Sequence, residues 1–211
     1  MKLLTVVLVT AVLLSQSFAE LENAVLEDSD CSPNGDLSDR QDAWESLKKR
    51  NGTLQYMVRS SYTSGKWGDG TLLCSSGAKY SNSEEEHTGV WVTAVRLNGT
   101  VETFADNITV TRSNGSSTWN TIEKQGITRV TKYELLFSDA TTCELYKIIM
   151  QLFGTERSGY QLWVDDNSKD NVSSCCLSAL ATRTNRTFVT YEKEACQEME
   201  DFWEEMTQKE T

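Results

Sequence analysis

The chain has little histidine and little proline, with one of each in 211 residues. The only histidine, His87, lies in the acidic turn "SEEEHTG". A Ser-His-Asp or Cys-His catalytic site is therefore nearly excluded. The sequence also lacks the GxxxxGK[ST], GxGxxG and HExxH motifs, and it has no CxxC pair for zinc. These absences favour a binding protein over an enzyme, with no cofactor and no metal site. The single proline, Pro33, precedes every strand-like segment, so no predicted strand lacks a backbone donor.

Long apolar runs are also scarce, and the one that exists stands near the start of the chain. Residues 3–14 follow a basic lysine and precede "SFA", which is the pattern of a secretory signal peptide cleaved after Ala19. The run is shorter than the ~18 apolar residues of a membrane span. We therefore expect a secreted protein with a signal peptide at 1–19, an acidic lead at 20–37 and one folded domain at 38–211. The net charge of −11 argues against nucleic acid and membranes as partners.

Two covalent features agree with an extracellular protein. The six cysteines are even in number, which predicts disulfides but leaves their pairing open. Adjacent Cys175 and Cys176 are poorly placed to pair with each other. Six Asn-X-Ser/Thr sequons predict exposed positions in a glycoprotein. They are Asn51, Asn98, Asn107, Asn114, Asn171 and Asn185.

A short helix is predicted ahead of a series of strands. In "SDRQDAWESLKK", Ser38 and Gln41 have the spacing of a capping box that begins the helix. Trp44 and Leu47 share one helix face, and the Asn-Gly pair at 51–52 ends the helix. The tail is predicted to be helical again in "SSCCLSALAT" and in "YEKEACQEMEDFWEEM". An apolar stripe on the last segment is expected to pack on the wall of the fold. The stripe consists of Met199, Phe202, Trp203 and Met206.

Between the helices, the apolar period changes from that of a helix to two. Eight short segments alternate in this way and are separated by turn signals such as "LNGT" and "RSNGSS". Their number and spacing predict an all-β meander that closes into a barrel or forms a sandwich. The predicted strands are 53–63, 71–80, 88–97, 100–111, 118–124, 128–138, 142–150 and 158–165.

An eight-stranded barrel has room inside for one small ligand. In the strand "GYQLWVDD", alternation places Gln161, Trp163 and Asp165 on one face. Aromatic side chains with nearby carboxylates suit an organic ammonium. The same rings could instead fill a solid core, and the sequence pattern leaves both possibilities open.

Several blocks resemble the tick salivary histamine-binding lipocalins. They are "QDAWESLK", "YMVRSSY", "KWGDGTLLC", "LLFSDATTCELYKI", "GYQLWVDD" and "NVSSCCLSAL", in family order over most of the chain. The resemblance implies an eight-stranded antiparallel lipocalin-like barrel with an N-terminal and a C-terminal helix. It implies secretion in saliva and capture of a small host inflammatory mediator to evade host defence, with histamine or a related biogenic amine as first candidate. We expect a monomer.

The resemblance also implies disulfides. The family's two bridges correspond to Cys74–Cys196 and Cys143–Cys176 in this chain. Cys31 and Cys175 remain, and we predict that they form a third bridge.

The family's binding residues correspond to Tyr62, Trp67 and Trp163 as aromatic walls, with Asp106 as an acid and Glu144 as an acid of a second, lower site. Two family acids are missing, because Gln161 stands where the family has Glu and Gly65 where it has Asp. A pocket short of acids would suit a lipid mediator, such as a leukotriene or fatty acid, with Arg59, Arg96 or Arg129 for its carboxylate. A third possibility is a surface-acting immune modulator without a small ligand.

Overall fold

The structure is a computed structural model, and it describes residues 40–62, 72–97, 99–125, 130–152 and 155–208. The predicted signal peptide and acidic lead lie outside the described residues, as do Cys31, Trp67, Asn98 and Arg129. None of the helices within the described ranges is long and apolar enough to span a membrane.

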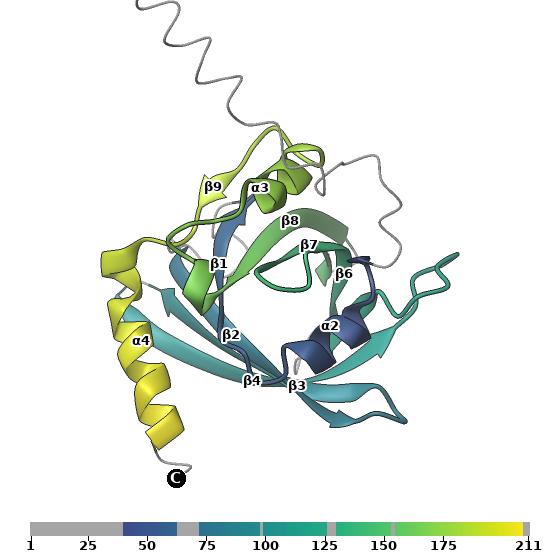
Figure 1. The fold of residues 1–211 in the computed structure, drawn as a ribbon, viewed down its shortest axis with the longest axis horizontal. Helices are drawn as coiled ribbons and strands as arrows, with labels where there is room; N and C mark the ends of the chain where they lie inside the picture. The colour runs from purple at the N-terminus through teal and green to yellow at the C-terminus, as the bar shows by residue number, and fades with distance from the viewer. Residues whose placement is uncertain (1–39, 63–71, 98, 126–129, 153–154, 209–211) are drawn as a thin grey trace, which may run out of the picture. The chain divides into compact units, whose positions relative to one another are not determined.

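Eight antiparallel strands form a closed barrel (Figure 1), which confirms the predicted lipocalin-like fold over the sandwich. Closure comes from β1, since Gln55 lies opposite Asp165 in β8 and opposite Gly77 in β2. The strands are β1 Gln55–Ser60, β2 Leu72–Ser83, β3 Thr88–Leu97, β4 Thr100–Thr111, β5 Thr121–Gln125, β6 Val130–Ser138, β7 Cys143–Leu152 and β8 Thr155–Asp165. A two-residue strand, β9 (Phe188–Val189), pairs with β1 and was not predicted, because two residues are too few to show alternation.

The helix α2 (Ala43–Lys49) lies at one end of the barrel and belongs to its core. Trp44 and Leu47 are buried on one face, as predicted. The predicted capping box is wrong. The N-cap is Asp42, whose carboxylate accepts a 2.9 Å hydrogen bond from the Glu45 backbone N–H, while the Gln41 side chain donates to the Leu136 carbonyl. The helix therefore begins after Asp42, a good N-cap residue that lies closer to the apolar face than Ser38 does in the sequence.

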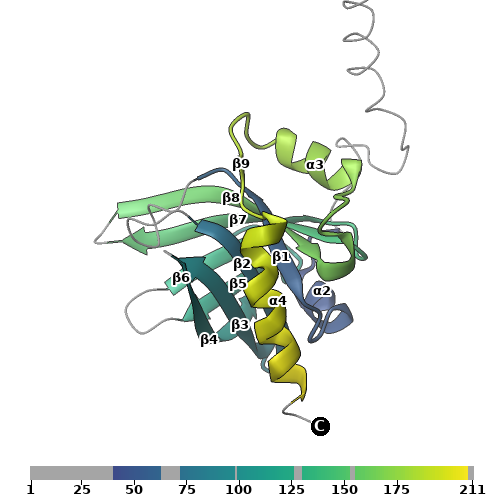
Figure 2. The same cartoon turned by 90° about the vertical axis from the view of Figure 1, so that its left-hand side faces the viewer.

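Two C-terminal helices lie on the outside of the barrel, α3 (Ser174–Ala181) and α4 (Lys193–Gln208), preceded by a short 3-10 turn, η3 (Asp166–Ser168). Figure 2 shows α4 running along the wall, where it contacts β2 and β3. Met199 and Trp203 are buried there, and Trp203 Nε1 donates to Ser76 Oγ at 2.8 Å. Met206, at the end of the predicted stripe, is 39% exposed.

Two disulfides fasten these helices as predicted. Cys74–Cys196 joins β2 to α4, and Cys143–Cys176 joins β7 to α3. Cys175 is also disulfide-bonded. Its pairing with Cys31 stays a prediction because Cys31 lies outside the described residues.

Candidate ligand site in the barrel

The second half of β8 lines the barrel interior with the residues that alternation places on one face. Gln161 and Trp163 are buried, and Trp163 Nε1 donates a 3.0 Å hydrogen bond to Gln161 Oε1. Gln161 Nε2 in turn donates to Tyr62 Oη. Burial raises the pKa of Tyr62 well above its usual value, so this phenol is protonated at neutral pH. The structure thus brings three of the expected binding residues into one hydrogen-bonded wall.

Gly159 leaves the space that the Tyr62 ring occupies, a role that the sequence analysis missed. A Cβ atom at position 159 would lie 2.5 Å from Tyr62 Cδ1 and 2.8 Å from Tyr62 Cε1. Favourable carbon–carbon contacts begin at about 3.5 Å, so a methyl group does not fit beneath the ring. A signal was present in "GYQLWVDD", because a glycine inside a strand often marks a close approach.

Gly159→Ala is expected to displace the Tyr62 ring and to break its hydrogen bond with Gln161. The expected loss is about 1–3 kcal/mol in the free energy of unfolding, measured by urea denaturation, because the added methyl overpacks the site. In a Tyr62→Ala background the methyl group meets no ring, so the same change should cost clearly less. Equal losses in the two backgrounds would contradict this role of Gly159.

Four aromatic rings contact one another in the core of the barrel, and we call them the aromatic layer. Between ring centroids, Trp91 lies 4.8 Å from Tyr133, 5.5 Å from Trp163 and 6.4 Å from Tyr146. Tyr133 and Tyr146 also meet edge to face at 6.1 Å. We call the part of the interior next to α2, around Lys79 and Glu144, the lower half, and the part around Asp106 and Lys124 the upper half. Part of the interior is therefore filled by the chain's own rings.

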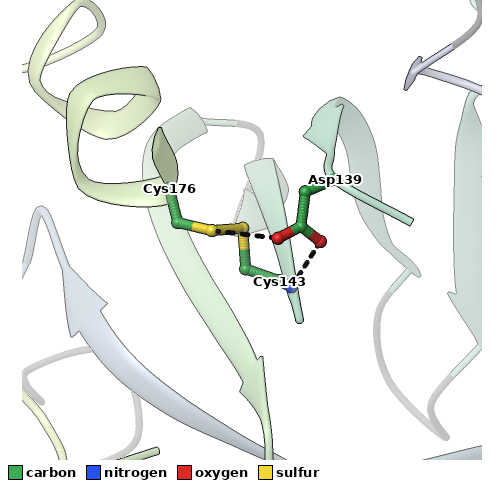
Figure 3. A group of neighbouring side chains, drawn as sticks. All are labelled: Asp139, Cys143 and Cys176. Atoms are coloured by element: carbon green, nitrogen blue, oxygen red, sulfur yellow. Dashed lines mark hydrogen bonds between the residues drawn. A yellow bond between two sulfur atoms is a disulfide. The ribbon is translucent and has the colours of Figure 1, made fainter. Parts of the chain in front are cut away.

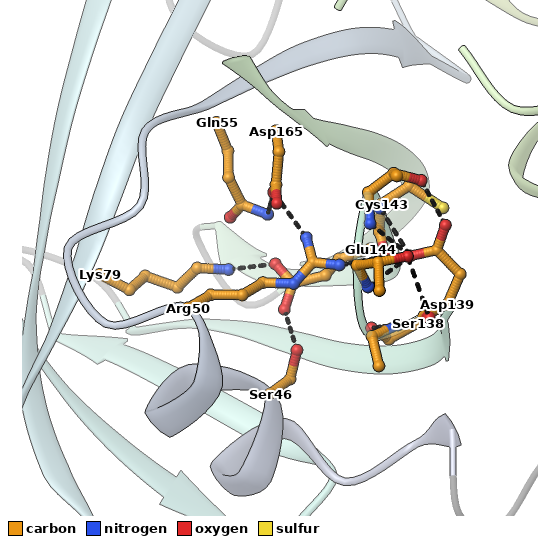
Figure 4. Close-up of polar contacts among 12 residues, drawn as sticks. Ser46, Arg50, Gln55, Lys79, Ser138, Asp139, Cys143, Glu144 and Asp165 are labelled. Atoms are coloured by element: carbon orange, nitrogen blue, oxygen red, sulfur yellow. Dashed lines mark hydrogen bonds and ion pairs between the residues drawn. The ribbon is translucent and has the colours of Figure 1, made fainter. Parts of the chain in front are cut away.

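The lower half holds a buried ion pair between Lys79 and Glu144 (Figure 4). Lys79 Nζ lies 2.5 Å from Glu144 Oε2, and Ser46 Oγ of α2 donates to Glu144 Oε1 at 2.5 Å. Burial alone would raise the pKa of Glu144, but the charges of Lys79 and Arg50 bring it to about 2. Burial lowers the pKa of Lys79, against the attraction of Glu144. Glu144 is thus ionised, and its negative charge is compensated by Lys79 and Arg50 of the same chain.

Arg50, the C-cap residue of α2, connects the helix to the strand ends around it (Figure 4). Its guanidinium donates to Asp165 Oδ1 at 2.6 Å, to Asp139 Oδ1 at 3.3 Å and to the Cys143 carbonyl at 3.2 Å. Gln55 Nε2 also donates to Asp165 Oδ1, at 3.0 Å. Asp165 therefore anchors the α2 end of the barrel, although it shares a strand face with Gln161 and Trp163.

The upper half holds a second pair of acid and lysine. Asp106 lies directly opposite Trp91 in the β3–β4 ladder and faces the interior, whereas Asn107 is exposed, as the sequence predicts. Asp106 Oδ2 lies 2.8 Å from Lys124 Nζ. Lys124 also donates to Thr93 Oγ1 at 2.7 Å, and its ammonium lies 5.1 Å from the centroid of the Trp91 ring. The acid expected to bind an amine is therefore already paired.

One cluster of metal-ligating residue types occurs among the described residues, formed by Asp139, Cys143 and Cys176 (Figure 3). The two sulfur atoms are joined in a disulfide, so neither can bind a metal as a thiolate. Asp139 Oδ1 accepts hydrogen bonds from the backbone N–H groups of Thr142, at 2.7 Å, and Cys143, at 2.9 Å. Asp139 therefore stabilises the turn between β6 and β7, and the two cysteines fasten α3 to β7.

The predicted glycosylation sites are compatible with the structure where it describes them. Their modification stays a prediction, for which exposure is one requirement. The exposed sequon asparagines are Asn51, Asn107, Asn114, Asn171 and Asn185.

A closed antiparallel barrel with a helix at one end, a helix on its wall and an aromatic, charged interior defines a lipocalin-type protein. The solved structure of the siderocalin Ex-FABP has this fold. It matches with a TM-score of 0.52 and 13% identity over 67% of this chain and 94% of that chain.

A family model described as tick histamine binding protein matches residues 32–209, and the chain therefore belongs to this family. The male-specific histamine-binding salivary protein of Rhipicephalus appendiculatus is 26% identical over 167 residues, which cover 75% of this chain and 82% of that protein. Family and fold are those of proteins that bind small molecules.

Proposed function

We propose that this protein is a secreted salivary scavenger that captures one small host mediator in the upper half of its barrel. The wall of Tyr62, Gln161 and Trp163 and the Asp106–Lys124 pair provide polar groups beside the rings of the aromatic layer. Small-ligand sites commonly combine apolar surface with a few placed polar groups in this way. The name of the salivary relative supports secretion in saliva. Capture would then lower the concentration of free mediator by mass action.

The pairing of Asp106 and Glu144 with lysines decides which ligand class the geometry supports best. An ammonium ligand needs a carboxylate, because a buried cation without a partner costs several kcal/mol. Asp106 pairs with Lys124 and Glu144 with Lys79, and the carbonyl oxygen of Gln161 already accepts from Trp163. An acidic or neutral lipid mediator, of eicosanoid or fatty-acid type, leaves these pairs intact. We conclude that the site suits such a ligand better than an amine.

β8 carries a cation for a lipid carboxylate farther from α2 than Gln161. Arg157 is exposed on the inner face of β8, directly opposite the buried Met150 of β7. The arginines suggested by the sequence are less suitable. Arg96 donates to the Ala195 carbonyl of α4 at 2.9 Å, and Arg59 lines a pocket on the outer side of the barrel. Arg157 is therefore our candidate for the carboxylate.

A biogenic amine such as histamine is the second candidate. It is favoured by the name of the salivary relative and by the position of Asp106 beside the aromatic layer. To reach that carboxylate, an amine would have to displace the Lys124 ammonium.

Native mass spectrometry followed by titration calorimetry, with a panel of fatty acids, leukotrienes, histamine and serotonin, tests the proposed function. We expect one lipid per chain and only weak binding of the two amines. Arg157→Gln should weaken binding of the acidic lipid and Lys124→Gln should strengthen binding of histamine, each by ~10–100-fold, because the first change removes the cation for the carboxylate and the second frees Asp106. Lys132→Gln, which changes a lysine that is 48% exposed, is the matched control and should change neither affinity. Tight histamine binding by the unmodified protein would reject the lipid proposal, and binding of no compound would reject scavenging.

A further inference from the structure

The ammonium group of Lys79 lies in a cage with the chemistry of a binding site for an amine. Its Nζ is 2.5 Å from Glu144 Oε2 and 3.0 Å from Tyr146 Oη. The same atom lies 4.9 Å from the centroid of the Trp91 ring and 5.0 Å from that of Tyr146. A carboxylate and two aromatic faces around one cation are the groups that recognise organic ammonium ligands.

The cage is closed on every side that the structure describes. The side chains of Lys79 and Glu144 are 2% and 1% exposed, and Trp91 and Tyr146 are fully buried. Ser46 of α2 holds the second oxygen of Glu144. Two further charges act on Lys79, the repulsive Arg50 and the attractive Asp165, which pair with each other. A free ligand therefore meets a cage that is sealed and already neutral.

Lys79 projects into the cage from β2, whereas Glu144 and Tyr146 belong to β7, a strand that is not adjacent to β2 in the barrel. The lysine therefore spans the lower half of the interior.

We propose that Lys79 is a built-in occupant of an amine cage, a tethered ammonium that takes the place of a second ligand. The lysine limits the protein to one ligand per chain, in the upper half. Shortening its side chain converts the lower half into a site for a free primary ammonium ion. The count of one ligand rests on the proposed function, whereas the cage can be tested without any mediator.

Chemical rescue is the direct test. Lys79→Ala removes three methylene groups and the ammonium, which are the atoms of n-propylammonium. The variant should have a lowered Tm, and n-propylammonium chloride should raise this Tm with a saturable dependence on concentration, as a ligand that binds the native state does. The unmodified protein should show no such rise beyond that caused by sodium chloride.

Three controls separate the cage from general salt and packing effects. 1-Propanol, which matches the chain without the charge, should not rescue Lys79→Ala. Lys79→Met fills the cage with an uncharged chain, so it should be destabilised yet insensitive to n-propylammonium. Lys132→Ala, which changes an exposed side chain of β6, should respond to neither compound.

A measurement on the unmodified protein keeps the proposal testable if Lys79→Ala folds poorly. Under native conditions an amine-acylating reagent should modify Lys132, which is 48% exposed, and leave Lys79 unmodified, as mapped by peptide mass spectrometry. Rapid acylation of Lys79, rescue by 1-propanol equal to that by n-propylammonium, or no response of Lys79→Ala to n-propylammonium at any concentration would each overturn the proposal. Failure of the lipid and amine titrations alone would leave the cage standing and reject only the proposed function.

Discussion

Replacing Arg50 by methionine is expected to lower the free energy of unfolding by about 2–4 kcal/mol, because it leaves two partly buried carboxylates without their cation. The Arg50 guanidinium is 4% exposed and lies against Asp165 and Asp139. It also donates to the Cys143 carbonyl. Methionine fills much of the same volume but supplies no donor, so the two aspartates and that carbonyl lose their hydrogen bonds to the guanidinium.

Urea denaturation with matched variants checks this expectation. Lys49→Met changes an exposed residue in the last turn of the same helix and should cost less than about 0.5 kcal/mol. The double variant Arg50→Met, Asp165→Asn should lose less than the sum of its single changes, because the second change removes one of the stranded charges. Strict additivity, or a loss below about 1 kcal/mol for Arg50→Met, would contradict the role of Arg50 as the charge centre of the α2 end.

Removal of the Cys74–Cys196 disulfide by a double change to alanine is expected to cost about 3–5 kcal/mol. The bridge joins residues 122 positions apart, and it holds α4 where Met199 and Trp203 are buried against the barrel. Without the bridge the unfolded chain gains the entropy of a long open loop, and α4 keeps only its packing and the hydrogen bond from Trp203 to Ser76.

The second disulfide supplies the comparison. Cys143–Cys176 encloses a separation of 33 residues, so its removal should cost less than that of Cys74–Cys196, by about 1 kcal/mol in the chain-entropy model. Thermal and urea unfolding of the two double-alanine variants measure the difference. The reverse order would show that strain or local packing, and not loop length, decides the contribution of these bridges.

The strands were predictable because their signal is local. A β-strand turns successive side chains to opposite faces, so the period of two was visible in the sequence, and all eight predicted barrel strands are present. The start of α2 was misjudged, since both Ser38 and Asp42 are good N-cap residues and only the folded backbone shows which one accepts the hydrogen bond.

By itself, the sequence determined that Gln161, Trp163 and Asp165 share one face of their strand. It also determined that Asp106 and Asn107 point to opposite faces of theirs, because successive side chains of a strand alternate. It could not show that Asp165 pairs with Arg50, or that Asp106 and Glu144 each pair with a lysine. Lys124 meets Asp106 through the register of two paired strands, and Lys79 meets Glu144 across the barrel, 65 positions away along the chain. Such contacts exist only once the barrel has closed, and they decide which charges remain for a ligand.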